Sequence, residues 1–486
     1  MKSKKRILCV IPAVHNVGLT SISLALVQAF RSEGVKVGFF KPISVHDDPG
    51  NEHSTSMMRE RFGMKVPQPI GIRKAERLIA QGEAGVLMEK VVENSWELNN
   101  YDVVIVEGIA AAKETYFSRQ INSMLVHSLD GDVAIAVSPN GRTMEQLIES
   151  IKIEAYEFTK SDYRCGVVVN KIGQDGSSLT VAECSEAIRE MGAKLLGAIP
   201  WLPELIATSQ DKPVKLLEIV EKSASYINRD WLLPYAETPR EHRISPAEFR
   251  SRLIHQASAR IKRIVLPEGT ELRTLEAAAI CVERNIAHLV LLAKPKEVKQ
   301  AYRQLGMDIP AEIEIVDPEN VWPSFVEPLY QIRKEKGMTR EEAEKILKKD
   351  SVMLGTMMLQ MGIVDGLVSG ALHTTADTIR PAMQVIKMPP GGKLISSIFF
   401  MGLPQQMLIY GDCAVNYDPS AEDLAEIAIQ CADMADTFGI PKRVAMLSHS
   451  TGKSGKGESV ERVRKETAIV KAKRPDIPID GPLQYD

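Results

Sequence analysis

The sequence of 486 residues contains few cysteines, and they are far apart. None forms a C-x-x-C pair; the six are Cys9, Cys165, Cys184, Cys281, Cys413 and Cys431. Disulfide frameworks and cysteine zinc sites need closer and more regular spacing. The cysteines therefore predict buried free thiols in a reducing compartment.

A long hydrophobic run is also missing. No segment reaches the roughly 18 apolar residues that span a bilayer. The apolar run that starts after Arg6 is interrupted by Pro12 and His15 and lacks a small-x-small cleavage site, so it favours a first β-strand over a signal peptide. We expect a cytoplasmic protein without a membrane partner.

Neither sign of charge is in excess. The chain has 60 Lys and Arg against 63 Asp and Glu, which gives no support for nucleic acid as a main partner. The hydrophobic content of 44% is ordinary for a globular protein, and the length favours about three domains.

The N-terminal part alternates short apolar segments with helical patterns. This alternation predicts an α/β fold with a doubly wound parallel sheet. The expected strands are residues 6–12, 35–40, 101–106, 133–137, 166–169 and 196–199.

A degenerate phosphate-binding loop follows the first expected strand. Gly18 and Thr20 fit the pattern G-x-x-x-x-G-K-[ST], but Ala13 stands at the first glycine position and Leu19 at the lysine position. Without that lysine, the charge that holds the terminal phosphates is missing. We favour a structural βα turn over active nucleotide hydrolysis.

The pattern changes after about residue 210. Residues 211–259 are rich in charge, helix formers and proline, which is typical of a helical linker. A new strand, 263–266, then opens a second α/β region. We expect domains at 1–210 and 260–486 with the linker between them.

Two segments of the second region have the features of anion sites. In residues 362–387 an apolar strand ends at Ser369, a helix should start at His373, Thr374 and Thr375, and Arg380 follows one turn later. An ordinary βα turn remains the alternative.

A second strand is followed by a hydroxyl-rich, basic loop at 448–457, which is either an anion site or a mobile surface loop. Its candidate residues are Ser448, Ser450, Thr451, Gly452 and Lys453.

Several ordered motifs together resemble the phosphate acetyltransferase family. They are K-R-I-V-L-P-E-G-T-E at 262–271, I-R-K-E-K-G-M-T at 332–339, V-D-G-L-V-S-G-A-L-H-T-T-A-D-T-I-R-P at 364–381, Y-G-D-C-A-V-N at 410–416, A-M-L-S-H-S-T-G-K-S-G at 445–455 and D-G-P-L-Q-Y-D at 480–486. The N-terminal half resembles the dethiobiotin-synthetase-like P-loop domain of the long bacterial form. There Glu107 and the pair Asn170-Lys171 would lie near nucleotide, with ordinary strand-end polar groups as the favoured alternative.

The resemblance implies transfer of an acetyl group between coenzyme A and inorganic phosphate, giving acetyl phosphate. It implies an αβα transferase domain of two lobes, isocitrate-dehydrogenase-like, without a metal or a permanently bound cofactor. Coenzyme A is then a substrate, and a homo-oligomer is expected. By motif, Arg333 and Arg380 match arginines that bind phosphate and coenzyme A, and Ser369, His373, Thr374, Thr375 and the 448–457 loop would line the site. His373 and His449 are expected to be structural or ligand-contacting.

Two departures from the family pattern shape further expectations. Only the linker stands where the long form has a middle domain, so we expect that domain to be absent. The N-D-L-S-R-G motif and a nearby aspartate are not found before Asp486, so we expect the catalytic serine, arginine and aspartate to lie beyond it and this chain to transfer acetyl poorly or not at all. The alternatives are butyryl specificity, or a binding module for coenzyme A or nucleotide without catalysis.

Overall fold

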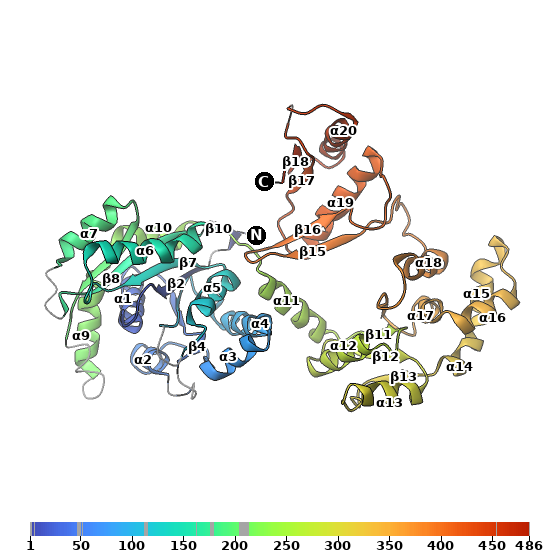
Figure 1. Ribbon diagram of the computed structural model, residues 1–486, viewed down its shortest axis with the longest axis horizontal. Helices are drawn as coiled ribbons and strands as arrows, with labels where there is room; N and C mark the ends of the chain where they lie inside the picture. The colour runs from blue at the N-terminus through green and yellow to red at the C-terminus, as the bar shows by residue number, and fades with distance from the viewer. Residues whose placement is uncertain are drawn as a thin grey trace. The chain divides into compact units, whose positions relative to one another are not determined.

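The computed structural model describes residues 2–3, 5–45, 50, 52–110, 115–161, 163–174, 179–203, 213–452 and 454–485. The chain divides into two compact units. The first comprises Met1–Ser251 with the short segments Phe400–Leu408 and Gly439–Pro441, and the second comprises the remaining residues. Each unit is described by itself (Figure 1).

A parallel sheet of six strands forms the centre of the first unit, in the order β3-β6-β2-β7-β8-β9. The strands are β2 (Arg6–Pro12), β3 (Val37–Phe40), β6 (Val103–Glu107), β7 (Asp132–Val137), β8 (Cys165–Ile172) and β9 (Lys194–Pro200). Side chains alternate between the two faces of a strand, so Cys9 and Ile11 enter one hydrophobic core while Leu8 and Val10 enter the other. The doubly wound parallel sheet is confirmed.

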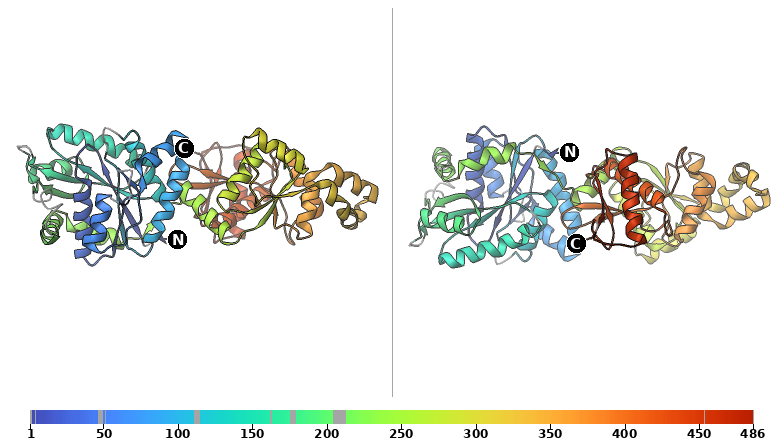
Figure 2. Two further views of the ribbon diagram at one scale, coloured as in Figure 1. Left: turned by 90° about the horizontal axis from the view of Figure 1, so that it is seen from below. Right: turned by 90° about the horizontal axis from the view of Figure 1, so that it is seen from above.

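Helices cover both faces of this sheet (Figure 2). One face packs against α1 (Leu19–Ser32), α9 (Pro213–Ala224) and α10 (Leu232–Glu237). The other packs against α4 (Ala84–Ser95), α5 (Ser118–Leu129), α6 (Met144–Thr159) and α7 (Val181–Glu190). Such burial on both faces is what a parallel sheet requires.

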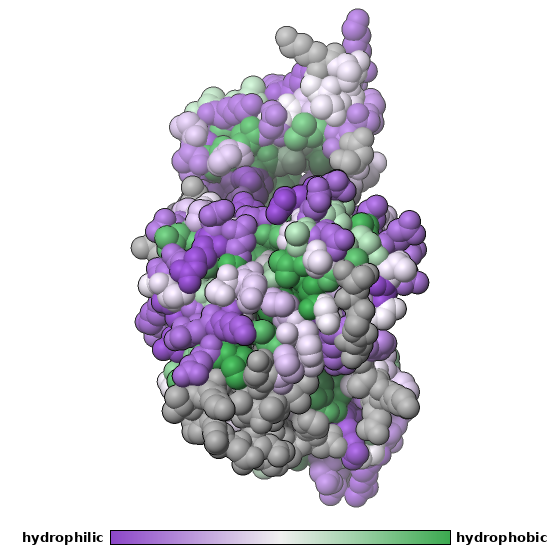
Figure 3. All heavy atoms as spheres, turned by 90° about the vertical axis from the view of Figure 1, so that its left-hand side faces the viewer, coloured by the Kyte–Doolittle hydropathy of each residue, from purple (hydrophilic) through white to green (hydrophobic). Residues whose placement is uncertain are grey.

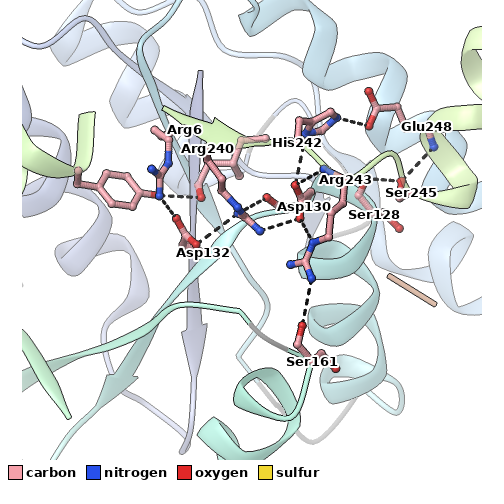
Figure 4. A network of polar contacts seen from close by, with 12 residues as sticks. Arg6, Ser128, Asp130, Asp132, Ser161, Arg240, His242, Arg243, Ser245 and Glu248 are labelled. Carbon is pink, nitrogen blue, oxygen red and sulfur yellow. Dashed lines mark hydrogen bonds and ion pairs between the residues drawn. The ribbon is translucent and has the colours of Figure 1, made fainter. Parts of the chain in front are cut away.

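The segment after α10 lies against the edge of this unit and is not extended away from it. Arg240, His242 and Arg243 surround Asp130, which lies just before β7 (Figure 4). The helix α11 (Pro246–Ala259) then begins, and Glu248 near its start bonds back to His242 at 2.7 Å. The part of the expected linker up to Ser251 thus belongs to the first compact unit.

A parallel sheet of four strands, in the order β13-β12-β11-β14, organises the first part of the second unit. Its strands are β11 (Arg263–Leu266), β12 (His288–Leu292), β13 (Glu314–Val316) and β14 (Gly366–Leu367). One face packs on α12 (Leu272–Glu283) and α13 (Pro295–Gln304). The other packs on α15 (Val326–Arg333), α16 (Arg340–Lys349), α17 (Ser351–Gln360) and α18 (Thr375–Val385).

Strand β14 is shorter than the apolar run at 363–368 suggested. Ile363 is 39% exposed, and the carboxylate of Asp365 accepts the N–H of Arg263 at 2.9 Å. Register pairing with β11 therefore starts only at Gly366. The helical, basic segment 330–349 is divided at Gly337, whose φ of 87° is left-handed, and α16 starts after it with a capping box of Thr339 and Glu342.

The elements that follow α18 are β15 (Ile398–Gly402), β16 (Met407–Gly411), α19 (Ala421–Thr437), β17 (Val444–Leu447), α20 (Glu458–Lys473) and β18 (Ile479–Leu483). Strands β15 and β16 pair, β17 pairs in parallel with β18, and α19 and α20 form a small core with β17 and β18. Among helices of the described ranges, none has the length and hydropathy needed to cross a bilayer. The face shown in Figure 3 interleaves hydrophilic residues with smaller hydrophobic areas.

Candidate functional site

Side chains from the end of β8 hold the degenerate loop of the first unit by donating hydrogen bonds to its backbone carbonyls. Gly18 has a φ of 75°, and a Cβ at this position would lie 2.8 Å from Asn170 Nδ2. Asn170 Nδ2 donates to the carbonyl of Val17 at 2.8 Å, and Lys171 Nζ donates to the carbonyl of Asn16 at 2.8 Å. Glycine is therefore required here by both conformation and space.

The second predicted loop residue, Thr20, belongs to a buried polar chain. Its hydroxyl lies 2.8 Å from Ser54 Oγ, and Ser54 donates to Glu107 Oε1 at 2.8 Å. Lys41 Nζ donates to the same oxygen at 3.0 Å. A cavity of about 270 Å³ lies beside this loop and is lined by residues that include Ala13, His15, Arg119 and Arg142.

In the second unit, the two predicted arginines lie on helices that belong to one packed group. Arg333 is the last residue of α15, and Arg380 lies on α18, which packs against both α15 and α17. Ser369 lies between β14 and α18. Thr374 caps α18 by accepting the N–H of Asp377 at 3.2 Å, and Thr375 is the first residue of the helix.

The two arginines differ in exposure. The Arg380 side chain is 62% exposed and pairs with Asp377 at 3.4 Å. Arg333 is half-buried, and its Nε has neither solvent contact nor a hydrogen-bond partner within the described residues. The Ser369 hydroxyl likewise has neither solvent contact nor a hydrogen-bond partner within the described residues. Buried polar atoms without partners are uncommon in folded proteins, and a role in binding or catalysis is one explanation for them.

The backbone N–H groups of residues 370–373 have a partner that the motifs did not reveal. The carboxylate of Glu268, which is 6% exposed, accepts all four of them. His373 Nδ1 lies 2.7 Å from Glu268 Oε1. Burial raises the pKa of Glu268, but the hydrogen bonds from Leu372 and His373 outweigh it and lower the pKa to about 2.

The position of Glu268 follows from sheet topology. It stands two residues after β11, and β11 pairs in parallel with β14, whose end leads into residues 369–373. Adjacent parallel strands bring their carboxyl ends to the same edge. Comparing polar residues at these two strand ends would have revealed Glu268 from the sequence.

The second predicted loop, 448–457, is tied into its own part of the unit. Gly452 N–H donates to the carbonyl of Pro482 at 2.9 Å, and Ser448 N–H donates to Leu483 at 2.8 Å. Ser450 Oγ lies 3.0 Å from Ser454 Oγ, and Thr451 Oγ1 accepts the N–H of Gln484 at 3.0 Å. These hydroxyls are engaged in holding the loop. Lys453 lies outside the described residues.

The two groups of predicted residues are not joined by direct contacts. Between the loop and residues 369–380, the described residues form no hydrogen bond or ion pair. Nor do His, Cys, Asp and Glu side chains of the described ranges gather in threes that could hold a metal ion. The predicted residues around 369–380 offer guanidinium, hydroxyl and imidazole groups, and Glu268 pairs with His373.

Comparison with known proteins covers nearly the whole chain. The family described as Phosphate acetyl/butaryl transferase matches residues 248–486, and a family described as AAA domain matches residues 6–209. The phosphate acetyltransferase of Pseudomonas aeruginosa is 36% identical over 610 residues, with 98% of this chain and 86% of that protein covered. The phosphate acetyltransferase of Escherichia coli is also 36% identical, with 99% and 88% covered.

Both alignments are longer than the present chain, so the relatives contain stretches without a counterpart in it. A crystal structure of a phosphotransacetylase from Streptococcus pyogenes is 37% identical, covering 50% of this chain and 74% of that one with a TM-score of 0.46. By its identity to full-length relatives, this chain belongs to the phosphate acetyltransferase family.

Proposed function

We propose that this protein transfers an acetyl group between coenzyme A and inorganic phosphate. The relatives that share more than a third of its residues are named for this activity. The observation within the structure that carries the proposal is the pair of buried, unpartnered donors Arg333 Nε and Ser369 Oγ, located on elements that adjoin the helix of Arg380. Donors of this kind suit an anionic substrate.

The chemistry of the reaction explains this choice of residues. The coenzyme A thiol loses its proton and its sulfur attacks the carbonyl carbon of acetyl phosphate. A carbon–sulfur bond forms, the carbon–oxygen bond to the phosphoryl group breaks, and phosphate leaves with the electron pair and ends with the proton that the thiol lost. Negative charge accumulates on the carbonyl and phosphoryl oxygens, so fixed guanidinium and hydroxyl donors lower the barrier. We assign phosphate binding to Arg333, Ser369 and Arg380, with Thr374 and Thr375 beside them.

The direct test measures acetyl transfer by the purified 486-residue chain. Acetyl phosphate and coenzyme A are mixed with the protein, and loss of free thiol is followed together with acetyl-CoA formation. We expect slow transfer, because the family's N-D-L-S-R-G motif is not found in this sequence, and a higher kcat/KM for acetyl-CoA than for butyryl-CoA in the reverse direction. Absence of both transfer and coenzyme A binding would contradict the proposal, and preference for butyryl-CoA would contradict the acyl specificity.

We also infer a cytoplasmic homo-oligomer whose partners are these small molecules. All six cysteines are free, which suits a reducing compartment. Light scattering of the purified protein measures the number of subunits, and a monomeric mass would contradict the oligomer.

A further inference from the structure

A single carboxylate organises the turn that precedes α18. The N–H groups of Gly370 and Ala371 donate to Glu268 Oε2 at 3.0 and 2.9 Å. Those of Leu372 and His373 donate to Glu268 Oε1 at 2.6 and 3.0 Å. Four consecutive N–H groups of this kind form an anion-binding concavity, and here a side chain of the protein already occupies it.

Two further contacts fix the same turn. The ring nitrogen Nδ1 of His373 bonds to Glu268 Oε1 at 2.7 Å. Arg273, near the start of α12, donates through Nη2 to the carbonyl of Ala371 at 2.9 Å. The turn is therefore held through both its N–H groups and one of its carbonyls.

We expect Glu268 to stay bonded to this turn and not to be displaced by a substrate anion. Its side chain is 3% exposed and, as an ionised carboxylate, only accepts hydrogen bonds. Withdrawing it would leave a buried charge without donors, which is strongly unfavourable. Because the carboxylate cannot donate, His373 carries a proton on Nδ1, and its Nε2 is the nitrogen that does not face Glu268.

We propose that Glu268 is a positioning residue for the phosphate subsite. It occupies the N–H groups of residues 370–373 so that the phosphoryl group is bound by side chains, and it holds Ser369 and His373 on either side of that turn. This inference rests on the proposed function, because the subsite is the one that Arg333, Ser369 and Arg380 form there. It assigns no contact between Glu268 and the substrate.

The substitution Glu268→Gln tests the role without changing the size of the side chain. A glutamine has one acceptor oxygen, so its NH₂ group must face either the N–H pair of residues 370 and 371 or the donors of residues 372 and 373. We expect the KM for phosphate and for acetyl phosphate to rise at least about tenfold. The KM for coenzyme A should change less than about threefold, because the rest of the molecule is unaltered.

A matched control comes from Glu342, in the capping box of α16. Its carboxylate also accepts a backbone N–H, that of Thr339 at 2.9 Å, but it does not bond to residues 370–373. Glu342→Gln should lower the melting temperature without raising the KM for phosphate. Equal KM values for phosphate in the two variants would overturn the positioning role. Glu268→Asp, which keeps the charge, should recover part of the affinity if Glu268→Gln folds poorly.

A second readout is independent of catalysis. Nitrogen NMR of the imidazole of His373, identified by its loss in His373→Gln, should show protonated Nδ1 in the unaltered protein and a mixture of tautomers in Glu268→Gln. An unchanged tautomer in Glu268→Gln would overturn the inference even if transfer is observed. A chain that shows the expected NMR change but neither transfer nor coenzyme A binding would contradict the proposed function alone.

Discussion

At the scale of single residues, Glu268 and Arg380 differ in burial, which fits the positioning role that we propose for Glu268 and the binding role that we propose for Arg380. Glu268 is 6% exposed and has all its donors supplied by the protein. The Arg380 side chain is 62% exposed, with one exposed ion pair. Exposed pairs contribute little to stability, so the guanidinium is available to an anion at small cost to the fold.

Glu466 on α20 is a second buried carboxylate, and it makes stability depend on pH. It is 2% exposed, and its Oε2 has no hydrogen-bond partner among the described residues. Burial, and then the nearby charge of Asp412, raise its pKa to about 7. Between pH about 4.5 and 7 the folded state thus binds more protons than the unfolded state, and the free energy of unfolding falls as pH rises through this window.

We expect Glu466→Gln to remove that dependence. At pH 8 the variant should be more stable than the unaltered protein by about 1 to 3 kcal/mol, with a smaller difference at pH 5. Urea unfolding at the two pH values measures this. Glu461→Gln, an exposed position on the same helix, is the control and should change stability little. If Glu466→Gln loses as much stability between pH 5 and pH 8 as the unaltered protein does, the assignment of this dependence to Glu466 is wrong.

Some single residues could be predicted from the sequence and others could not. Thr339 and Glu342 form the capping box that their spacing predicts, because capping depends on residues only three positions apart. Ser369, His373, Thr374 and Thr375 follow β14 as the motif indicates. Glu268 was missed because its partners lie more than a hundred positions away. Only the pairing of β11 with β14 brings them together.

At the scale of elements, the segment that follows α10 is fastened to the first sheet by a charged cluster (Figure 4). Asp130, which is 5% exposed, accepts hydrogen bonds from Arg240 Nη2 at 2.8 Å and from Arg243 N and Nε at 2.9 and 3.1 Å. Arg6 pairs with Asp132 on β7 and donates to the carbonyl of Thr238 at 2.9 Å. Buried charges of this kind are tolerated because each is paired and hydrogen-bonded.

His242 makes the stability contributed by this charged cluster depend on pH. Its ring lies 2.7 Å from Glu248 and 3.4 Å from Asp130. Burial lowers the pKa of His242, but the hydrogen bonds to Asp130 and Glu248 outweigh it and raise the pKa to about 9. The resulting stability is fully present below pH about 6.5 and is lost as pH rises to about 9.

We expect His242→Gln to abolish this contribution. The unaltered protein should lose up to about 3 kcal/mol of its free energy of unfolding between pH 6 and 9.5 that the variant does not lose. Unfolding by urea at both pH values provides the measurement. His53→Gln, an exposed position in the same unit, should keep the dependence of the unaltered protein. The same pH dependence in His242→Gln would contradict the assignment.

The elements themselves were predictable wherever hydrophobic periodicity was strong. The strands of the first sheet were expected within a few residues because buried parallel strands are continuously apolar. The length of β14 was not, since Ile363 is apolar but exposed and Asp365 binds the backbone of Arg263. For the 448–457 loop, composition allows either an anion site or a mobile loop. Its hydrogen bonds to residues 482–484 cannot be predicted from composition.

At the scale of the whole molecule, the two compact units have separate hydrophobic cores. The expected α/β architecture with an N-terminal parallel sheet and a transferase region is confirmed. The absence of the middle domain of the long family form stays a prediction; relatives aligned over more than 600 residues contain stretches without a counterpart in this chain. The transferase residues that the structure groups together all belong to the second unit.

The central claim is that Arg380 binds the anionic substrate of an acetyl transfer, and one comparison tests it most directly. The kcat/KM for acetyl transfer is measured in Arg380→Ala and in Arg340→Ala, whose side chain is 56% exposed and also forms an ion pair on a helix of the second unit. We predict that Arg380→Ala lowers kcat/KM about 100-fold with little change in melting temperature, while Arg340→Ala lowers it less than about threefold. Equal values of kcat/KM in the two variants would contradict the account.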